Sequence, residues 1–298
     1  MLQILPKSEF SKIYNAPIEK HQKLSLIADM CRLNTFVSVK KAGSGHLGSS
    51  FSAMDIAVYL YYERMNIVEL GINSPDRDIY FSSKGHDVPG LYSIFYSLGI
   101  LPLEKLLKLR RMNGVDGHPE INIPGIEAST GSLGMGISKG KGMAWAKTYN
   151  KNGGHVYVLI GDGELQEGEV WEGAMFSAHH KLDNLCAIVD YNKMQSDNLN
   201  ENIMGLEPLA DKWISFGWNV LEIDGHNSQE MEVAFNDARN VKNKPTIIIA
   251  HTIKGKGVSY MENSPTWHGS LELSNADFRQ ALLELGATES EIGEIINE

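Results

Sequence analysis

The sequence predicts an α/β fold in which a parallel sheet carries helices on both faces. Short apolar runs that are typical of buried strands alternate with segments of helical periodicity, and glycine-containing or polar turns follow these runs. No internal repeat or low-complexity linker interrupts this alternation. We therefore expect residues 1–298 to form a single domain with an N-terminal helical extension.

The first part of the chain has helical patterns. Residues 18–41 place apolar side chains at helical spacing, which predicts a long amphipathic helix. Residues 52–63 predict a second helix, with Ser52 as its N-cap and Asp55 at the capping-box position.

From residue 155 onward, strand and helix patterns alternate. Apolar runs predict strands at 155–160, 185–192, 218–223 and 246–250. Helical patterns predict helices at 166–180, 207–217 and 228–240, and an acidic helical tail at 275–297. Parallel sheets of this kind bind ligands beyond the carboxyl ends of their strands. The polar residues that follow each strand are therefore the first candidates for a functional site.

Composition excludes several classes of protein. Lys and Arg number 27 against 37 Asp and Glu, a net charge of −10, which argues against a basic nucleic-acid binder. We expect no membrane span, because no stretch of about 18 consecutive apolar residues occurs. The N-terminus has no pattern of a signal peptide. Cys31 and Cys186 lie in apolar patterns and are expected to be buried free thiols, which favours a cytoplasmic location.

A Gly-Asp-Gly turn at the end of one predicted strand carries the strongest chemical signal. Gly161 and Gly163 allow a phosphate to approach the backbone closely, and Asp162 supplies a carboxylate oxygen. Asn192 lies at the end of the next predicted strand, and the ends of neighbouring parallel strands meet at one edge of a sheet. One carboxylate, one amide oxygen and a nearby backbone carbonyl suit Mg²⁺ with a bound diphosphate.

This spacing resembles the thiamine diphosphate motif, in which GDG is followed by about 25–30 residues and an Asn; here Tyr191-Asn192 replaces the usual Asn-Asn. Further segments resemble transketolases and occur in that family's order. They are GSGHLGSS from residue 43, SKGHDVPG from 83, GHPE from 117, TGSLGMG from 130 and TIKGKG from 252. The resemblance covers residues 20–270 and implies the diphosphate-binding domain of a transketolase, with thiamine diphosphate and Mg²⁺ as cofactors.

The resemblance also implies roles for individual residues. Asp162, Asn192 and the backbone carbonyl of Met194 would hold Mg²⁺. The residues that would bind the cofactor are His86, Gly131, Leu133, Gly163, Lys254 and His268. Lys84 and Lys256 are further candidates for positive charge near the diphosphate, although solvent-exposed lysines are an equally good interpretation.

The candidate catalytic residues are three histidines and two glutamates. His46, His118 and His268 would line the substrate channel, where imidazole can exchange protons near neutral pH. Glu167 and Glu172 would belong to an acidic network that links two active sites of the family's dimer. The competing interpretations are surface histidines in loops and solvated charges on a helix.

The family's pyrimidine-binding and C-terminal domains are expected to be absent from this chain. The resemblance therefore implies the N-terminal subunit of a split transketolase, inactive alone and working on sugar phosphates in an α₂β₂ assembly with a C-terminal subunit. Three alternatives remain open. They are a related enzyme for an unusual sugar phosphate, the α subunit of a 2-oxo acid dehydrogenase or decarboxylase, and a non-catalytic binding subunit.

Overall fold

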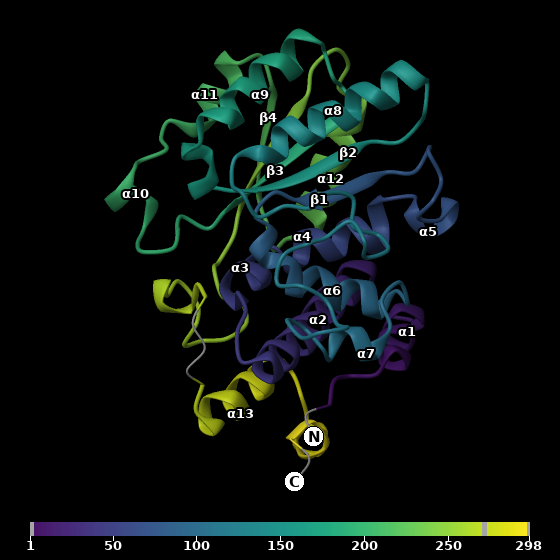
Figure 1. The fold of residues 1–298 in the computed structure, drawn as a ribbon, viewed down its shortest axis with the longest axis vertical. Helices are drawn as coiled ribbons and strands as arrows, with labels where there is room; N and C mark the ends of the chain where they lie inside the picture. The colour runs from purple at the N-terminus through teal and green to yellow at the C-terminus, as the bar shows by residue number, and fades with distance from the viewer. Residues whose placement is uncertain (1–2, 270–272, 297–298) are drawn as a thin grey trace. The chain divides into compact units, whose positions relative to one another are not determined.

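The computed structural model describes residues 3–269 and 273–296, and within this range the chain forms two compact units (Figure 1). The first unit contains the residues up to Tyr59, then His86–His118, and then the residues from Ile253 onward. The second contains Leu60–Gly85 and Pro119–Thr252. The expectation of one domain over the whole chain stays a prediction.

The second unit is built on a five-stranded parallel sheet. Its strands are β1 (Ile79–Ser82), β2 (Val156–Gly161), β3 (Leu185–Tyr191), β4 (Asn219–Asp224) and β5 (Thr246–His251), in the spatial order β1-β2-β3-β5-β4. The predicted fold class is confirmed, and β2 to β5 coincide with the four predicted runs. Strand β1 escaped prediction because its four residues, Ile-Tyr-Phe-Ser, are too short to show a period.

Helices cover both faces of this sheet, as predicted. Val158 in β2 points toward α8 (Met135–Asn150), where Gly140 is so close that an added Cβ would lie 2.5 Å from a Val158 methyl. The neighbouring Tyr157 points to the opposite face, where its ring meets Phe235 of α12 (Ser228–Asn240) at 5.7 Å. Figure 1 shows α8 and α12 on opposite sides of the strands. Buried apolar side chains fill the space between α8, α9 (Gly168–His179) and the sheet.

The remaining helical segments of the second unit connect the strands. They are η1 (Leu60–Arg64), α5 (Ile67–Leu70), η3 (Gly163–Gln166), α10 (Asn200–Ile203) and α11 (Leu209–Ser215). The predicted helices at 166–180, 207–217 and 228–240 correspond to α9, α11 and α12. The short turn η2 (Gly85–Asp87) lies where the second unit gives way to the first along the chain.

The first unit is helical in its described part. Its elements are α1 (Lys7–Asn15), α2 (Lys20–Ala42), α3 (Leu47–Ser52), α4 (Met54–Tyr59), α6 (Val88–Ser97), α7 (Leu103–Leu106), η4 (Pro265–Trp267), α13 (Asn275–Glu284) and α14 (Glu289–Ile296). Helix α2 is the long helix predicted at 18–41. The Glu19 carboxylate caps it by accepting two backbone N–H groups, and Gly43, with φ +74°, ends it.

Two helix boundaries differ from the predictions. The expected helix 52–63 is two short helices and a π-helical turn, and Ser52 ends α3 instead of capping the next helix; its hydroxyl donates to the Ser49 carbonyl. The tail expected as one helix from 275 breaks between α13 and α14, where Gly286 adopts φ +87°, and the expected residue 297 lies outside the described residues. A left-handed residue cannot continue a right-handed helix.

The structure agrees with the expectation for the two cysteines. Cys31 and Cys186 are both buried and free, as predicted. Over residues 3–269 and 273–296, no helix combines the length and apolar character needed to cross a membrane.

Stability is expected to fall as the pH drops from 6.5 toward 4, partly because of His155. Burial, with the nearby Arg239, Arg64 and Lys242, lowers the pKa of His155 to about 4, against the opposing charge of Asp78. The unfolded chain therefore binds a proton in this window that the folded chain does not. The free energy of unfolding, measured with urea, should differ between pH 7 and pH 5 by about 1–3 kcal/mol less in His155→Gln than in the original chain. An unchanged dependence in the variant would contradict this assignment.

Candidate active site

Asp162 lies directly after β2 and starts the turn η3. It is buried, and its two carboxylate oxygens accept backbone N–H groups from Gly163, at 2.7 Å, and from Lys193. Burial, together with the negative charge of Asp190, raises the pKa of Asp162 to about 7. A buried carboxylate beside a second carboxylate is a favourable position for a cation.

Asn192 follows β3 at the same edge of the sheet, as the sequence predicts. Gly161 pairs with Asp190 in the register of β2 and β3, so Asp162 and Asn192 extend from neighbouring strand ends. The Asn192 side-chain oxygen accepts the Met194 N–H at 3.1 Å, and its amide donates to Asp190 at 3.3 Å.

Met194 forms an isolated antiparallel bridge with Leu199. Backbone groups of Lys193 and Gln195 make the hydrogen bonds that flank the bridge, so the Met194 carbonyl is not used by it. The predicted metal ligands are therefore a carboxylate, an amide and a backbone carbonyl. In the described part of the chain, no three His, Cys, Asp or Glu side chains gather as a metal site.

Asn200 is a buried polar residue that sequence reasoning missed. It is 4% exposed, and among the described residues neither its side-chain oxygen nor its nitrogen makes a hydrogen bond of normal geometry. A Cβ added to Gly163 would lie 3.5 Å from the Asn200 oxygen, and the nearby amide lowers the pKa of Asp162. A buried amide without a partner beside the Gly-Asp-Gly turn fits the presence of a hydrated cation or diphosphate there.

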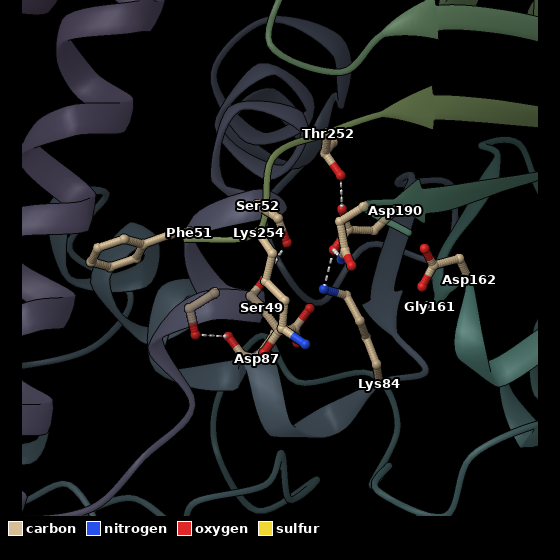
Figure 2. Close-up of polar contacts among 12 residues, drawn as sticks. Ser49, Phe51, Ser52, Lys84, Asp87, Gly161, Asp162, Asp190, Thr252 and Lys254 are labelled. Carbon is tan, nitrogen blue, oxygen red and sulfur yellow. Dashed lines mark hydrogen bonds and ion pairs between the residues drawn. The ribbon is translucent and has the colours of Figure 1, made fainter. Parts of the chain in front are cut away.

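Lys84 is not a surface lysine, which corrects one of its two sequence interpretations. Its ammonium lies 2.5 Å from an oxygen of Asp190, and both side chains are buried. The Thr252 hydroxyl donates to the other Asp190 oxygen, so Asp190 joins groups from the ends of β1, β3 and β5 (Figure 2). Asp190 had a sequence signal, because an acidic residue within an otherwise apolar buried strand requires a partner.

Asp190→Asn is expected to destabilise the chain by about 3–5 kcal/mol, because it leaves the buried Lys84 ammonium without its counter-charge. The measurement is urea unfolding of the purified chain. The double variant Lys84→Met/Asp190→Asn should recover much of this loss, since the ammonium that lost its partner is then also removed. Equal stability of the single variant and the original chain would contradict the prediction.

Leu133 and Gly131 lie in the loop that leads into α8. Gly131 has φ +144°. The Leu133 side chain is 41% exposed, so it is available to contact a group outside this chain. Glu167 and Glu172 are exposed at the start and within the first turns of α9. Their role in an acidic network stays a prediction.

The four predicted histidines of the first unit come together. The ring of His46 lies 5.0 Å from that of His86, 6.4 Å from His118 and 5.4 Å from His268, and His86 lies 5.2 Å from His268. These residues come from four separate parts of the chain. Their convergence favours a functional cluster over surface histidines.

His46 is the central ring of this cluster. Its Nδ1 atom is buried and makes no hydrogen bond among the described residues. Burial, with the nearby positive charges of Arg110, His118 and Lys254, lowers the pKa of His46 to about 4. The imidazole is therefore neutral near pH 7, with a nitrogen available to accept or donate a proton.

Lys254 fixes the tautomer of His268. It is 1% exposed, and its ammonium lies 3.1 Å from the His268 Nδ1 atom. An ammonium group only donates, so Nδ1 is the acceptor and a neutral His268 carries its proton on Nε2. Gly255 and Gly257, both at positive φ, turn the backbone directly after Lys254.

Comparison with known proteins identifies the family. The family model for the transketolase thiamine diphosphate-binding domain matches residues 23–298. The chain belongs to the transketolase family. The resemblance inferred from the sequence motifs is thereby confirmed.

Two relatives are single subunits of about this length. The 6-deoxy-6-sulfo-D-fructose transketolase subunit SqwG of Clostridium sp. (strain MSTE9) is 40% identical over 87% of this chain and 94% of its own length. An apulose-4-phosphate transketolase subunit of Phocaeicola vulgatus is 39% identical over 83% of this chain and 88% of its own length.

Other relatives are much longer transketolases. The human transketolase is 37% identical over 84% of this chain, which spans only 40% of the human protein. The crystal structure of the Campylobacter jejuni transketolase superposes with a TM-score of 0.82 and 32% identity, over 89% of this chain and 43% of that chain. The matched part is thus the thiamine diphosphate-binding portion of the longer proteins.

Proposed function

We propose that this chain is the N-terminal subunit of a thiamine diphosphate- and Mg²⁺-dependent transketolase. It would transfer a two-carbon ketol unit from a ketose phosphate to an aldose phosphate together with a C-terminal subunit. The observation that carries the proposal is the match to two relatives named as transketolase subunits, over 94% and 88% of their own lengths. The convergence of four histidines in one unit and the strand-end carboxylate in the other support it.

In this proposal the second unit binds the diphosphate and the metal. Asp162, Asn192 and the Met194 carbonyl would hold Mg²⁺, and Gly163 would lie beside the diphosphate. Such a ligand fits two observations. The carboxylate of Asp162 is buried and its pKa is raised, and the buried amide of Asn200 makes no hydrogen bond of normal geometry among the described residues. Gly131 and Leu133 would pack beside the cofactor, which supplies carbanion stabilisation when bound.

The histidine cluster would handle the protons of the sugar hydroxyls. The His46 imidazole is neutral near pH 7 and can take a hydroxyl proton. His268 can donate from Nε2, because Lys254 holds Nδ1 as an acceptor. His86 and Lys254 would approach the diphosphate, while His118 would face the substrate. Glu167 and Glu172 would complete an acidic network at an α₂β₂ interface.

The substrate is proposed to be a sugar phosphate or a chemically related sugar. A specialised sugar is the second candidate, because the two subunit relatives are named for 6-deoxy-6-sulfo-D-fructose and apulose 4-phosphate. We also propose a cytoplasmic location, supported by two buried free thiols.

The test is a coupled ketol-transfer assay with thiamine diphosphate and Mg²⁺. The chain is assayed alone and then with a separately produced pyrimidine-binding and C-terminal subunit, against ordinary ketose phosphates and the two sugars named above. Activity only in the mixture supports the proposal. Full activity of the chain alone would refute the need for a partner.

Two further outcomes would replace the proposed function. Turnover of pyruvate without turnover of ketoses would indicate a 2-oxo acid dehydrogenase or decarboxylase subunit. Failure of the mixture to bind thiamine diphosphate in titration calorimetry would indicate a non-catalytic binding subunit.

A further inference from the structure

Glu164 is a buried carboxylate that none of the roles above uses. It directly follows the Gly-Asp-Gly turn and is 2% exposed. One of its oxygens accepts the Gly134 N–H at 2.8 Å and the Ser83 hydroxyl, and the other accepts the Gly161 N–H at 3.0 Å. All four residues belong to the second unit.

The three donors come from three separate segments, and each segment carries a candidate cofactor group. Gly161 ends β2 and precedes Asp162. Gly134 begins α8 with φ +86° and ends the loop that holds Gly131 and Leu133. Ser83 follows β1 and precedes the buried Lys84. A single carboxylate therefore sets the spacing between these three segments.

This arrangement requires a carboxylate and not an amide. The two backbone N–H groups approach different oxygens of Glu164, so both oxygens must be acceptors. In a Gln side chain of the same shape, the NH₂ group would face one of these N–H groups whichever way the amide is turned. An Asp side chain is one methylene shorter and would pull away from at least one donor.

We propose that Glu164 is a positioning residue that holds the Gly-Asp-Gly turn, the start of α8 and the end of β1 in the spacing required for the diphosphate. The inference rests on the proposed cofactor of this site. Glu164 acts through the three segments, because its own oxygens are occupied by internal hydrogen bonds. Its loss should therefore weaken cofactor binding more than it slows the reaction of the bound cofactor.

The test compares Glu164→Gln with the original chain in the assembled enzyme. Titration calorimetry with thiamine diphosphate and Mg²⁺ gives the cofactor affinity, and the transfer assay gives kcat at saturating cofactor. We expect a 10- to 100-fold weaker affinity, as for other residues that orient ligands, with kcat changed less than about threefold. Glu222→Gln is the control. Glu222 is an exposed glutamate on the edge strand β4, and it pairs with His251.

Ser83→Ala is the second variant and keeps the inference testable if Glu164→Gln does not fold. It removes one donor and leaves both backbone hydrogen bonds to Glu164, so we expect a weakening of about two- to tenfold in affinity. Original affinity in whichever of the two variants folds would overturn the inference. So would a loss of kcat at unchanged affinity, which would make Glu164 a group that touches the reacting atoms.

The original assembly separates this inference from the proposed function. If it binds thiamine diphosphate but transfers no ketol unit, the proposed reaction fails while the affinity comparison still decides the role of Glu164. If the original assembly does not bind thiamine diphosphate, both the proposed function and the positioning role of Glu164 are refuted.

Discussion

Asp162→Asn is expected to lower ketol transfer by the assembled enzyme about 100-fold or more, through loss of cofactor binding. Residues that only orient a metal ligand cost 10- to 100-fold when removed, so a direct ligand should cost at least the upper value, about 100-fold. Asn lacks the negative charge that Mg²⁺ requires. Its NH₂ group would also face either the Gly163 or the Lys193 N–H, both of which donate to the carboxylate.

A stability measurement distinguishes loss of cofactor binding from unfolding of the variant. Because burial and Asp190 raise the pKa of Asp162, the ionised carboxylate costs folding free energy at neutral pH. For a carboxyl whose folded pKa is raised, this cost appears as the pH rises through the unfolded value and is complete above about 7. In the Asn variant the removal of this cost offsets the backbone N–H that is left without an acceptor. The cofactor-free variant should therefore unfold at a temperature similar to that of the original chain at pH 8, although it no longer binds cofactor.

The measurements are titration calorimetry and thermal unfolding of the same samples. Asp183→Asn is the matched control, because Asp183 precedes β3 at the opposite end of the strand and accepts one backbone N–H, from Asn243 at 3.0 Å. It should leave cofactor affinity unchanged. Original affinity in Asp162→Asn would show that this carboxylate is not a ligand.

His46→Ala is expected to lower kcat by about 10²- to 10⁴-fold while the cofactor affinity stays within about threefold. The neutral ring lies at the centre of the histidine cluster, and its Nδ1 atom is unpartnered in the described part of the chain. Removal of the ring takes away a proton acceptor for the substrate but leaves the strand-end ligands of the second unit in place.

The pH dependence of kcat gives a second readout of the role of His46. The pKa of His46 is lowered to about 4, so its proton-accepting form is complete above about pH 5 and is lost only as the pH falls through 4. Any acidic limb of the kcat profile near pH 6 should therefore have the same position in the variant. His179→Ala, an exposed histidine on α9, is the control. A kcat within fivefold of the original would contradict a catalytic role.

Much of the sheet could be predicted because burial leaves a local trace in sequence. Strands β2, β3 and β5 are buried almost throughout, and such strands form continuous apolar runs. Helix α12 was predicted at its observed bounds, where apolar residues repeat at helical spacing, and in the structure Asn227 caps it. By contrast, β1 is too short to show a period, and Ser52 resembled a cap because a polar residue preceded an apolar run.

The residues of the candidate site also divide into those that could be predicted from the sequence and those that could not. Asp162 and Asn192 could be predicted because each follows an apolar run directly, and strand ends of a parallel sheet meet. Glu164 and Asn200 could not, because their importance lies in buried hydrogen-bonding groups that no spacing in the sequence reports. Lys84 remained undecided, since one lysine in a loop has the same local pattern whether its partner is water or a buried aspartate.

The sequence by itself determined the class of fold, the Gly-Asp-Gly turn and the identity of the histidines that lie in glycine-rich segments. These features depend on neighbours within a few residues, where steric limits and apolar periodicity act. Only the tertiary structure decided that four distant histidines meet around His46, that Asp190 neutralises Lys84, and that Glu164 joins three segments. Those contacts form between residues far apart in the chain, and burial then fixes which polar groups must find one another.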